Sequence, residues 1–472
     1  MERRDGDAIV LFGITGDLSY RKIMPALYHL ARRNVLTVPV VGVARQGWTL
    51  QQLTARVQES IKTFVPNADG AVVQRLIGLL RYVDGDYNDR ATFQKLREAL
   101  GAAQRPLHYL AVPPSMFEVV VDHLAATGNT QGARVVVEKP FGHDLASARE
   151  LNQCLHAHFP ESSIFRIDHY LGKEAVQNLL YFRFANSFLE PVWNRNFVAS
   201  VQVTMAESIG INGRGRFYEE TGAIRDVIQN HLLQIVALLT LEPPVQAEGE
   251  ALRDEKVKVL RAIRPVQHAE LLRGQFKGYR DEEGVAANSQ VETYAALVLH
   301  VDSWRWSGVP FYLRAGKRLP VTATEVVVEL RPPPADVFGS HGPEQPNHLR
   351  FRLGPDVAIA LGAHTKRPGP AMAGRDVELF VAQQQGADMD AYEVLISAAL
   401  IGDTAHFVRE DEVEAAWRIV DPVLKGTAPP VEYLPGSWGP PKAEDLIKGP
   451  CGWHNPGAQA QDWTRSCGRG TA

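Results

Sequence analysis

The feature that most constrains the fold of this chain lies near its N-terminus. There a short apolar run is followed by a glycine-rich turn and then by a helix-like segment. Residues 8–12 read AIVLF, which is typical of a strand buried on both faces, as in a parallel sheet. The turn GITGDL follows, and apolar residues then recur at helical spacing over residues 23–31. Backbone N–H groups at such a turn can receive a pyrophosphate, so this unit predicts a dinucleotide site. Thr15 occupies a glycine position of the full G-x-G-x-x-G pattern, which is therefore incomplete, so a purely structural turn is the alternative.

The length of the chain indicates two domains. Its 472 residues, 45% of them hydrophobic, exceed what one compact core usually contains. Strand-like and helix-like segments alternate at first, which predicts a doubly wound, Rossmann-like α/β domain over residues 1–168. Strand-like runs with turn-rich connections then cluster, which predicts a larger α+β domain with a mostly antiparallel sheet over residues 169–448. Residues 449–472 are rich in glycine, alanine and polar side chains, and we expect this tail to be poorly ordered.

Charge and cysteine content argue against several classes of protein. The chain has 50 Lys and Arg against 54 Asp and Glu, a net charge of -4, which disfavours nucleic-acid binding through phosphate neutralisation. Its three cysteines, Cys154, Cys451 and Cys467, are too few and too scattered for a disulfide framework or a zinc site. No apolar stretch approaches the ~20 residues of a membrane span. We therefore expect a soluble, cytoplasmic protein without nucleic-acid or membrane partners.

Arg45 ends the second strand-like run, VPVVGVA, and bears on the choice of cofactor. In an NAD site, an acidic residue at the end of this strand accepts hydrogen bonds from the ribose hydroxyls. An arginine at the same place suits the 2′-phosphate of NADP. A solvated arginine at a strand end is an equally simple interpretation of the position alone.

Two later segments carry side chains suited to an anionic ligand. EKPFG follows the strand-like run RVVV, so Lys139 emerges at the carboxyl edge of the sheet, where ligands of such folds collect. RIDHYLGKE crowds Asp168, His169, Tyr170 and Lys173 near the start of a helix, which favours a phosphate monoester. Spacing alone slightly favours a plainer interpretation, with Asp168 as a helix cap and the lysine extended to solvent.

His231 shares a helix face with apolar residues of the segment 224–238, so we expect it to point inward. A buried histidine is more often a hydrogen-bonded core residue than a catalyst. The catalytic interpretation requires a carboxylate that orients the imidazole, and Asp168 or Asp226 could supply it. With such a partner, His231 would serve as a general base.

Together these segments resemble glucose-6-phosphate dehydrogenases. GITGDL, GVAR, EKPFG, RIDHYLGKE, GAIRDVIQNHLLQ, RAGKRLP and DEVEAAWRIVDP occur in the order of that family over about residues 8–445. The resemblance implies oxidation of glucose 6-phosphate to 6-phosphogluconolactone, the first step of the oxidative pentose phosphate pathway, with hydride transfer to NADP and no metal. NAD is the second choice of cofactor. A homodimer or homotetramer is the family expectation.

The resemblance also implies a role for individual residues. His231 matches the general base, and Asp168 matches the carboxylate that pairs with it. Substrate contacts are implied for Lys139, His169, Tyr170, Lys173, Glu207, Asp226 and Lys317. Cofactor contacts are implied for Gly13, Thr15, Gly16, Asp17, Leu18, Arg45 and Lys139.

The chain departs from the family pattern in two places. Thr322 lies five residues after Lys317, where a basic residue is often found, and Ser19-Tyr20 replaces a small and a basic residue. The second departure leaves mixed use of NADP and NAD open, although Arg45 favours NADP. Two other functions remain as alternatives: a dehydrogenase of unphosphorylated sugars, and a catalytically silent protein that binds sugar phosphates.

Overall fold

The computed structural model describes residues 5–246, 249–335, 337–338, 345–383, 389–426, 428–448 and 451–463. The chain divides into two compact units. Unit 1 comprises Met1–Glu174, Pro244–Asp254 and Asp388–Glu414, and unit 2 comprises Ala175–Pro243, Glu255–Ala387 and Ala415–Ala472. We placed the boundary at residues 168/169 and did not foresee that two later segments join unit 1. Local patterns cannot reveal this because tertiary packing alone decides which core a helix joins.

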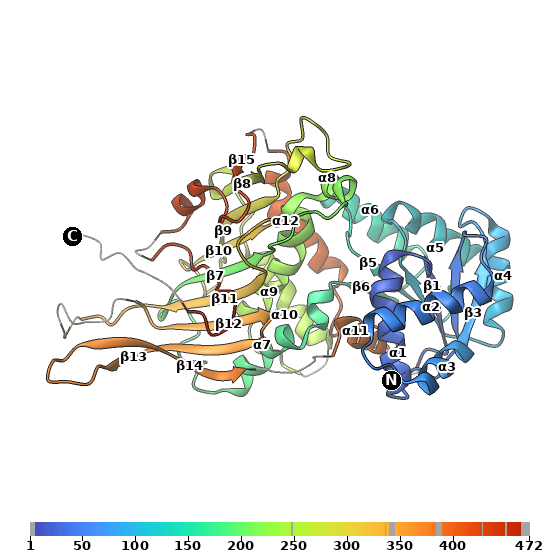
Figure 1. Ribbon diagram of the computed structural model, residues 1–472, viewed down its shortest axis with the longest axis horizontal. Helices are drawn as coiled ribbons and strands as arrows, with labels where there is room; N and C mark the ends of the chain where they lie inside the picture. Colours follow the sequence, from blue (N-terminus) through green and yellow to red (C-terminus); the bar gives the residue numbers. More distant parts are fainter. Residues whose placement is uncertain are drawn as a thin grey trace. The chain divides into compact units, whose positions relative to one another are not determined.

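Unit 1 contains a six-stranded sheet with the order β3-β2-β1-β4-β5-β6 (Figure 1). Every neighbouring pair is parallel. Its strands are β1 (Ala8–Phe12), β2 (Val40–Ala44), β3 (Leu80–Asp84), β4 (Pro106–Leu110), β5 (Arg134–Glu138) and β6 (Ile164–Ile167). The predicted doubly wound domain is confirmed, and the order reverses between β1 and β4, where ligands of such folds bind.

Helices flank this parallel sheet and bury an apolar stripe against it. They are α1 (Met24–Arg32), α2 (Leu50–Phe64), α3 (Gly70–Leu79), α4 (Arg90–Leu100), α5 (Phe117–Ala126), α6 (Leu145–His156) and α11 (Ala391–Ile401). A π-helical turn, Ser19–Ile23, joins the glycine turn to α1. Leu395 and Ile396 of α11 are fully buried in the same core as Leu11 of β1, which explains why this late segment belongs to unit 1.

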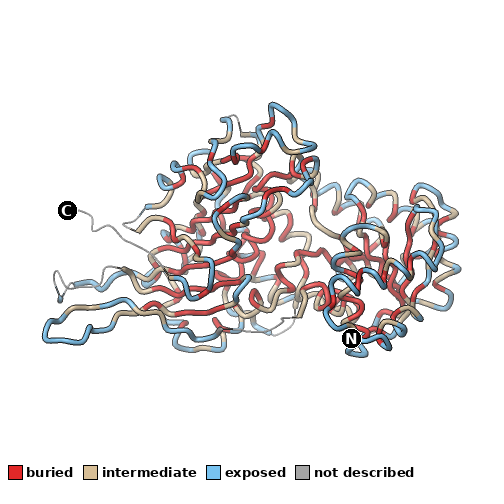
Figure 2. Tube along the Cα trace, in the orientation of Figure 1, coloured by how far each residue is buried: buried red, intermediate tan, exposed pale blue. Residues whose placement is uncertain are grey.

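Unit 2 contains a nine-stranded sheet with the order β14-β13-β12-β11-β7-β10-β9-β8-β15. Its strands are β7 (Val198–Ala206), β8 (Leu271–Phe276), β9 (Tyr294–His300), β10 (Pro310–Gly316), β11 (Ala323–Leu330), β12 (His348–Gly354), β13 (Ala358–Lys366), β14 (Gly374–Gln383) and β15 (Val431–Tyr433). Only the pairs β7–β10 and β8–β15 are parallel, so the mostly antiparallel sheet is confirmed. The remaining helices are α7 (Glu174–Ala185), α8 (Gly215–Ala223), α9 (Leu233–Thr240), α10 (Gly249–Ala262) and α12 (Glu410–Leu424). Figure 2 shows that buried residues concentrate in the central strands, whereas the far end of the β13–β14 hairpin is exposed.

Residues 451–463 pack against the sheet of unit 2, in place of the disorder that we expected. Three buried arginines donate hydrogen bonds to their backbone carbonyls: Arg314 to His454 (2.6 Å), Arg350 to Ala460 (2.7 Å) and Arg352 to Gly457 (2.9 Å). Composition misled us because these acceptors are backbone atoms, which any sequence supplies. The rest of the predicted tail, residues 449–450 and 464–472, lies outside the described residues.

The cysteines differ in state. Cys451 forms a disulfide, whereas Cys154 is free. Cys467 lies outside the described residues. A single disulfide does not make a disulfide framework. We nevertheless predicted no disulfide at all from this cysteine content.

Candidate active site

The glycine turn after β1 is held by close contacts that exclude a side chain. Gly13 has φ +78°, and a Cβ there would lie 2.2 Å from the carbonyl oxygen of Ala111. The Gly13 N–H donates to Val43 O (3.0 Å) and to the Tyr87 hydroxyl (2.8 Å), and the Gly16 N–H donates back to Gly13 O (2.9 Å). The turn therefore presents bare backbone at the carboxyl end of β1, as a dinucleotide cradle requires.

A cavity of about 360 Å³ opens beside this turn, at the reversal point of the parallel sheet. Four of the predicted cofactor residues line it: Gly13, Thr15, Gly16 and Arg45. Residues of the β3–α4 and β4–α5 connections form its other walls. This is the place where doubly wound folds bind dinucleotides, so the residues present fit a nicotinamide cofactor.

Asp17 and Leu18 are not among the residues that line this cavity. The Asp17 carboxylate pairs with Arg21 at 2.7 Å, and both side chains are mostly exposed. Leu18 packs against the core of unit 1. Their contact with the cofactor therefore stays a prediction.

Arg45 faces an acidic residue that sequence reasoning missed. Its Nη1 lies 3.5 Å from Oδ2 of Asp86, and both residues line the same cavity. Hydrogen bonds from Asn88 lower the pKa of Asp86, and the Arg45 charge adds to the effect. The available signal was the acidic sequence DGD, which begins with the last residue of the third strand; in a parallel sheet this strand ends beside the second.

The EKPFG turn follows β5 and places Lys139, half-buried, at the carboxyl edge of the sheet. Glu138 precedes it and accepts a hydrogen bond of 2.5 Å from the Tyr109 hydroxyl. Protein atoms around the Glu138 carboxyl exclude water and raise its pKa to about 7, although hydrogen bonds from Tyr109 and Tyr392 counteract the rise. Ionisation of this carboxyl therefore works against the folded state.

Replacing Glu138 by glutamine should remove a pH dependence of stability. The folded pKa of about 7 lies above the reference value of 4.5, so folded protein binds this proton more tightly. The stabilising contribution of the protonated carboxyl is fully present below pH 4.5 and is lost as pH rises through about 7, a loss of about 3 kcal/mol. Denaturant melts from pH 5 to 8 should show a smaller decline for Glu138→Gln than for wild type. Parallel declines would contradict the assignment.

The RIDHYLGKE segment forms one compact turn after β6. Asp168 is fully buried, and its Oδ1 accepts a hydrogen bond from the Tyr170 N–H at 3.0 Å, as a helix cap does. The Lys173 ammonium lies 3.6 Å from the centre of the Tyr170 ring, and the His169 ring lies 5.0 Å from the same ring. The structure thus brings these four predicted residues together in unit 1.

A second group of predicted residues meets in unit 2. Gly316 of β10 pairs with Ala206 of β7, so the residues that follow them lie side by side. Glu207 and Lys317 consequently form an ion pair. Thr322, the departure from the family pattern, hydrogen-bonds the Ser208 hydroxyl at 2.8 Å.

Tyr218 belongs to this second group and was not predicted. The Lys317 ammonium lies 5.6 Å from its ring centre. Burial raises the pKa of Tyr218 well above its usual value, and the carboxylates of Asp226 and Glu207 add to the rise. Its buried hydroxyl has no hydrogen-bond partner within the part of the chain that the structure describes. No local signal singles out this tyrosine, because its neighbours come from three separate segments.

His231 lies on an irregular, π-helical stretch, Ile224–Leu232, and only 2% of its surface is exposed. The prediction that it points inward is confirmed. Asp226 occupies the first turn of the same stretch and is half-buried. Such wide turns occur often at functional sites.

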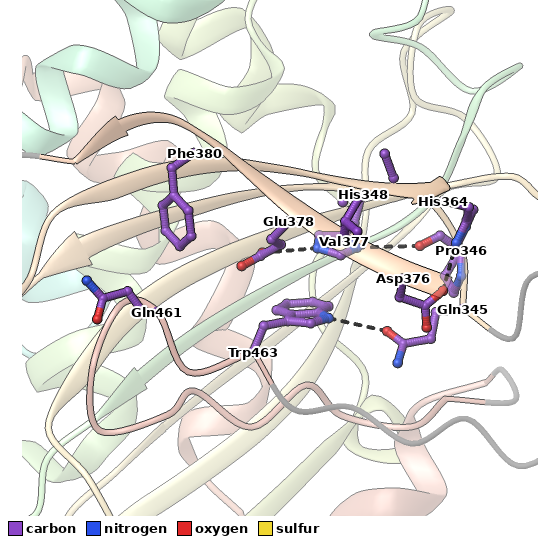
Figure 3. Close-up of a pocket in the computed structure, with 12 residues that line it drawn as sticks. Gln345, Pro346, His348, His364, Asp376, Val377, Glu378, Phe380, Gln461 and Trp463 are labelled. Atoms are coloured by element: carbon purple, nitrogen blue, oxygen red, sulfur yellow. Dashed lines mark hydrogen bonds and ion pairs between the residues drawn. The ribbon is translucent and has the colours of Figure 1, made fainter. Parts of the chain in front are cut away.

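A second cavity, of about 780 Å³, lies on β12–β14 and residues 461–463 (Figure 3). Trp463 is stacked between His348 and His454, with ring centres 3.9 and 4.3 Å away. Its indole N–H donates to Gln345 Oε1 at 3.3 Å, and His348 contacts Glu378 at 3.2 Å. None of the predicted site residues lines this cavity, and Gln461 and Trp463 of the tail form part of its wall.

The strand order, the glycine turn and the cavity at the reversal point define a dinucleotide-binding oxidoreductase with a second unit built on a mostly antiparallel sheet. Two family models cover nearly the whole chain: the glucose-6-phosphate dehydrogenase NAD binding domain matches residues 10–178, and the C-terminal domain of the same enzyme matches residues 180–454. The chain belongs to the glucose-6-phosphate dehydrogenase family.

Individual relatives are similar to this chain over almost their full length. Glucose-6-phosphate 1-dehydrogenase 1 of Mycobacterium tuberculosis is 44% identical over 455 residues, covering 95% of this chain and 96% of the relative. A crystal structure of the Mycobacterium avium enzyme matches with a TM-score of 0.90 and 44% identity, covering 96% of this chain and 99% of that one. A glucose-6-phosphate dehydrogenase in complex with its substrate matches with a TM-score of 0.87 and 37% identity, covering 94% and 98%.

Within the described ranges, no helix is both long enough and apolar enough to span a membrane.

Proposed function

We propose that this chain oxidises glucose 6-phosphate to 6-phosphogluconolactone and reduces NADP in preference to NAD. The observation that carries the proposal is similarity over about 95% of the chain to glucose-6-phosphate 1-dehydrogenases, in a chain that has a buried histidine at position 231. The preference for NADP is supported by Arg45, which lines the dinucleotide cavity and offers a guanidinium to the 2′-phosphate.

His231 is proposed as the general base. It takes the proton of the C1 hydroxyl as the C1–H bond breaks, and the electron pair of that bond leaves as hydride. The nicotinamide ring, when bound, accepts the hydride. Asp168 is proposed to orient the imidazole and to stabilise its protonated form, since a buried carboxylate favours a neighbouring positive charge.

The remaining predicted residues are proposed to hold the sugar phosphate. His169, Tyr170 and Lys173 lie on one turn and suit the phosphate. Glu207, Asp226 and Lys317 are proposed to contact sugar hydroxyls, and Lys139 to lie where substrate and cofactor meet. Binding energy from the remote phosphate then positions C1 for reaction.

Replacing Lys173 by alanine should chiefly raise the KM for glucose 6-phosphate, by about tenfold or more, through loss of a charge-assisted contact. Turnover at saturating substrate should fall less than KM rises, because the proposed general base and the other proposed phosphate contacts, His169 and Tyr170, remain in place. Initial rates over a range of substrate concentrations measure both constants. Lys95→Ala, on an exposed position of α4, removes the same charge and should leave KM unchanged. A KM for Lys173→Ala equal to that of wild type would remove this lysine from the phosphate site.

The substrate proposal is tested by comparing glucose 6-phosphate with unphosphorylated glucose. The proposal expects rapid cofactor reduction with the phosphate ester only. Equal rates would indicate a dehydrogenase of neutral sugars. Binding of the ester without reduction of either cofactor would indicate a silent binding protein.

Assembly into a homodimer or homotetramer and location in the cytoplasm are also proposed. Strand β14 is an edge strand of the sheet among the residues that the structure describes. It supports self-association, because Leu379, Phe380 and Val381 are 54%, 38% and 56% exposed. Light scattering of the purified chain gives the assembly state directly, and a monomer at micromolar concentration would contradict this part of the proposal.

A further inference from the structure

An acidic side chain shares the cofactor cavity with Arg45. Residues Ala44 and Asp84 pair across the parallel strands β2 and β3, so the segments that follow them run side by side. Asp86 consequently reaches the rim of the cavity, where its Oδ2 lies 3.5 Å from Arg45 Nη1. A cavity for a phosphorylated cofactor thus contains a carboxylate next to its proposed phosphate partner.

The position of Asp86 does not depend on Arg45. Its Oδ1 accepts hydrogen bonds of 2.9 Å from both the N–H and the side-chain amide of Asn88, and its carbonyl accepts one of 2.7 Å from Thr92. Gly85 lets the chain approach Thr92 closely, since a Cβ at that glycine would lie 2.2 Å from the Thr92 hydroxyl. Oδ2 is therefore held toward the cavity by the local fold.

Arg45 is held much less firmly. Its side chain is 69% exposed and that of Asp86 is 46% exposed, and an exposed pair at 3.5 Å contributes little to stability. A 2′-phosphate can therefore replace Asp86 as the ion-pair partner of Arg45 with little loss of free energy. The phosphate would then lie within a few ångströms of a fixed carboxylate, and two like charges so close repel each other.

We propose that Asp86 is a specificity-determining residue that narrows the preference for NADP and supports the use of NAD. The inference rests on the proposed function, because it concerns the same cofactor cavity. Asp86 competes for Arg45 and repels the 2′-phosphate, which disfavours NADP. Its Oδ2, which faces the cavity, accepts a hydrogen bond from the ribose hydroxyls of NAD, the role that an acidic residue at the end of the second strand usually has.

The test is Asp86→Asn, which keeps the size of the side chain and an oxygen for Asn88 but removes the charge. The kcat/KM values for NADP and for NAD are measured at saturating glucose 6-phosphate. The ratio of NADP to NAD efficiency should rise about tenfold, a change that corresponds to ~1.4 kcal/mol. The kcat/KM for NADP should rise and the kcat/KM for NAD should fall, so that both changes raise the ratio.

A matched control is Glu59→Gln. This glutamate lines an adjoining hollow and pairs with Arg56 at 3.4 Å, so the substitution removes the same charge without affecting the pair of Arg45 and Asp86. The cofactor ratio should stay at the wild-type value. In an Arg45→Ala background, Asp86→Asn should have a clearly smaller effect on NADP, because the competition for the guanidinium is gone.

An unchanged or lower ratio in Asp86→Asn would overturn the inference, as would an equal shift in Glu59→Gln. Either result leaves the proposed function intact if wild-type protein reduces NADP with glucose 6-phosphate. Failure of wild-type protein to reduce either cofactor would instead overturn the proposed function, so the two failures are distinguishable. Thermal melts of each variant verify that differences in rate are not differences in folding.

Discussion

Replacing His231 by asparagine should lower kcat by about 10²–10⁴-fold, because a general base acts mainly in the transition state. Asparagine retains a polar group of similar reach at this buried position, so binding of glucose 6-phosphate should change little. Initial-rate kinetics give kcat, and calorimetry with the sugar phosphate gives its affinity. A large loss of kcat with unchanged affinity identifies a group that acts on the reacting atoms.

The matched control is His108→Asn. His108 is also fully buried, but it lies inside β4, where burial lowers its pKa to about 4 and its ring bonds the carbonyl of Asn129 at 2.7 Å. That variant should lose stability while turnover per folded molecule stays close to wild type. A His231→Asn enzyme with wild-type kcat would remove this histidine from the mechanism.

Replacing Gly13 by alanine should reduce cofactor efficiency, measured as kcat/KM for NADP, by at least ~10²-fold. A Cβ at this position would lie 2.2 Å from Ala111 O, and the backbone has φ +78°, so the turn must move away from β4. The strain of a left-handed residue alone is about 1–2 kcal/mol, and the clash adds to it. Cofactor titration and a thermal melt measure the two consequences separately.

The variant Gly47→Ala is a control that separates the effect of backbone strain from the effect of a steric clash. Gly47 also has a positive φ, +67°, but a Cβ there meets nothing within 4 Å. This control should cost stability through backbone strain and leave cofactor affinity nearly unchanged. Equal cofactor affinities in Gly13→Ala and Gly47→Ala would show that the close approach at Gly13 is not needed for binding.

The architecture of unit 1 was predictable because its strands are continuous apolar runs, a pattern that parallel sheets impose by burying both faces. AIVLF is the strand β1, and the glycine turn that follows lines the cavity as expected. The inward orientation of His231 was also predictable, since helical spacing alone places it among apolar residues.

Contacts between distant segments were not predictable. The Tyr87 hydroxyl accepts a hydrogen bond from the Gly13 N–H across 74 residues of sequence. Asp86 accepts one from Arg45 across 41 residues. The acidic run DGD is visible in the sequence, but neither contact is, because the register between strands creates both. Residues 451–463 were misjudged for a different reason: their order depends on arginines of the sheet that bind backbone carbonyls, which no side-chain composition reveals.

The proposed activity is tested most directly by the initial rate of nicotinamide reduction by the purified chain with glucose 6-phosphate, followed by absorbance with NADP and with NAD in parallel. We expect rapid reduction with a higher kcat/KM for NADP. Absence of reduction with either cofactor, in protein shown to be folded by a cooperative thermal melt, would contradict the proposal.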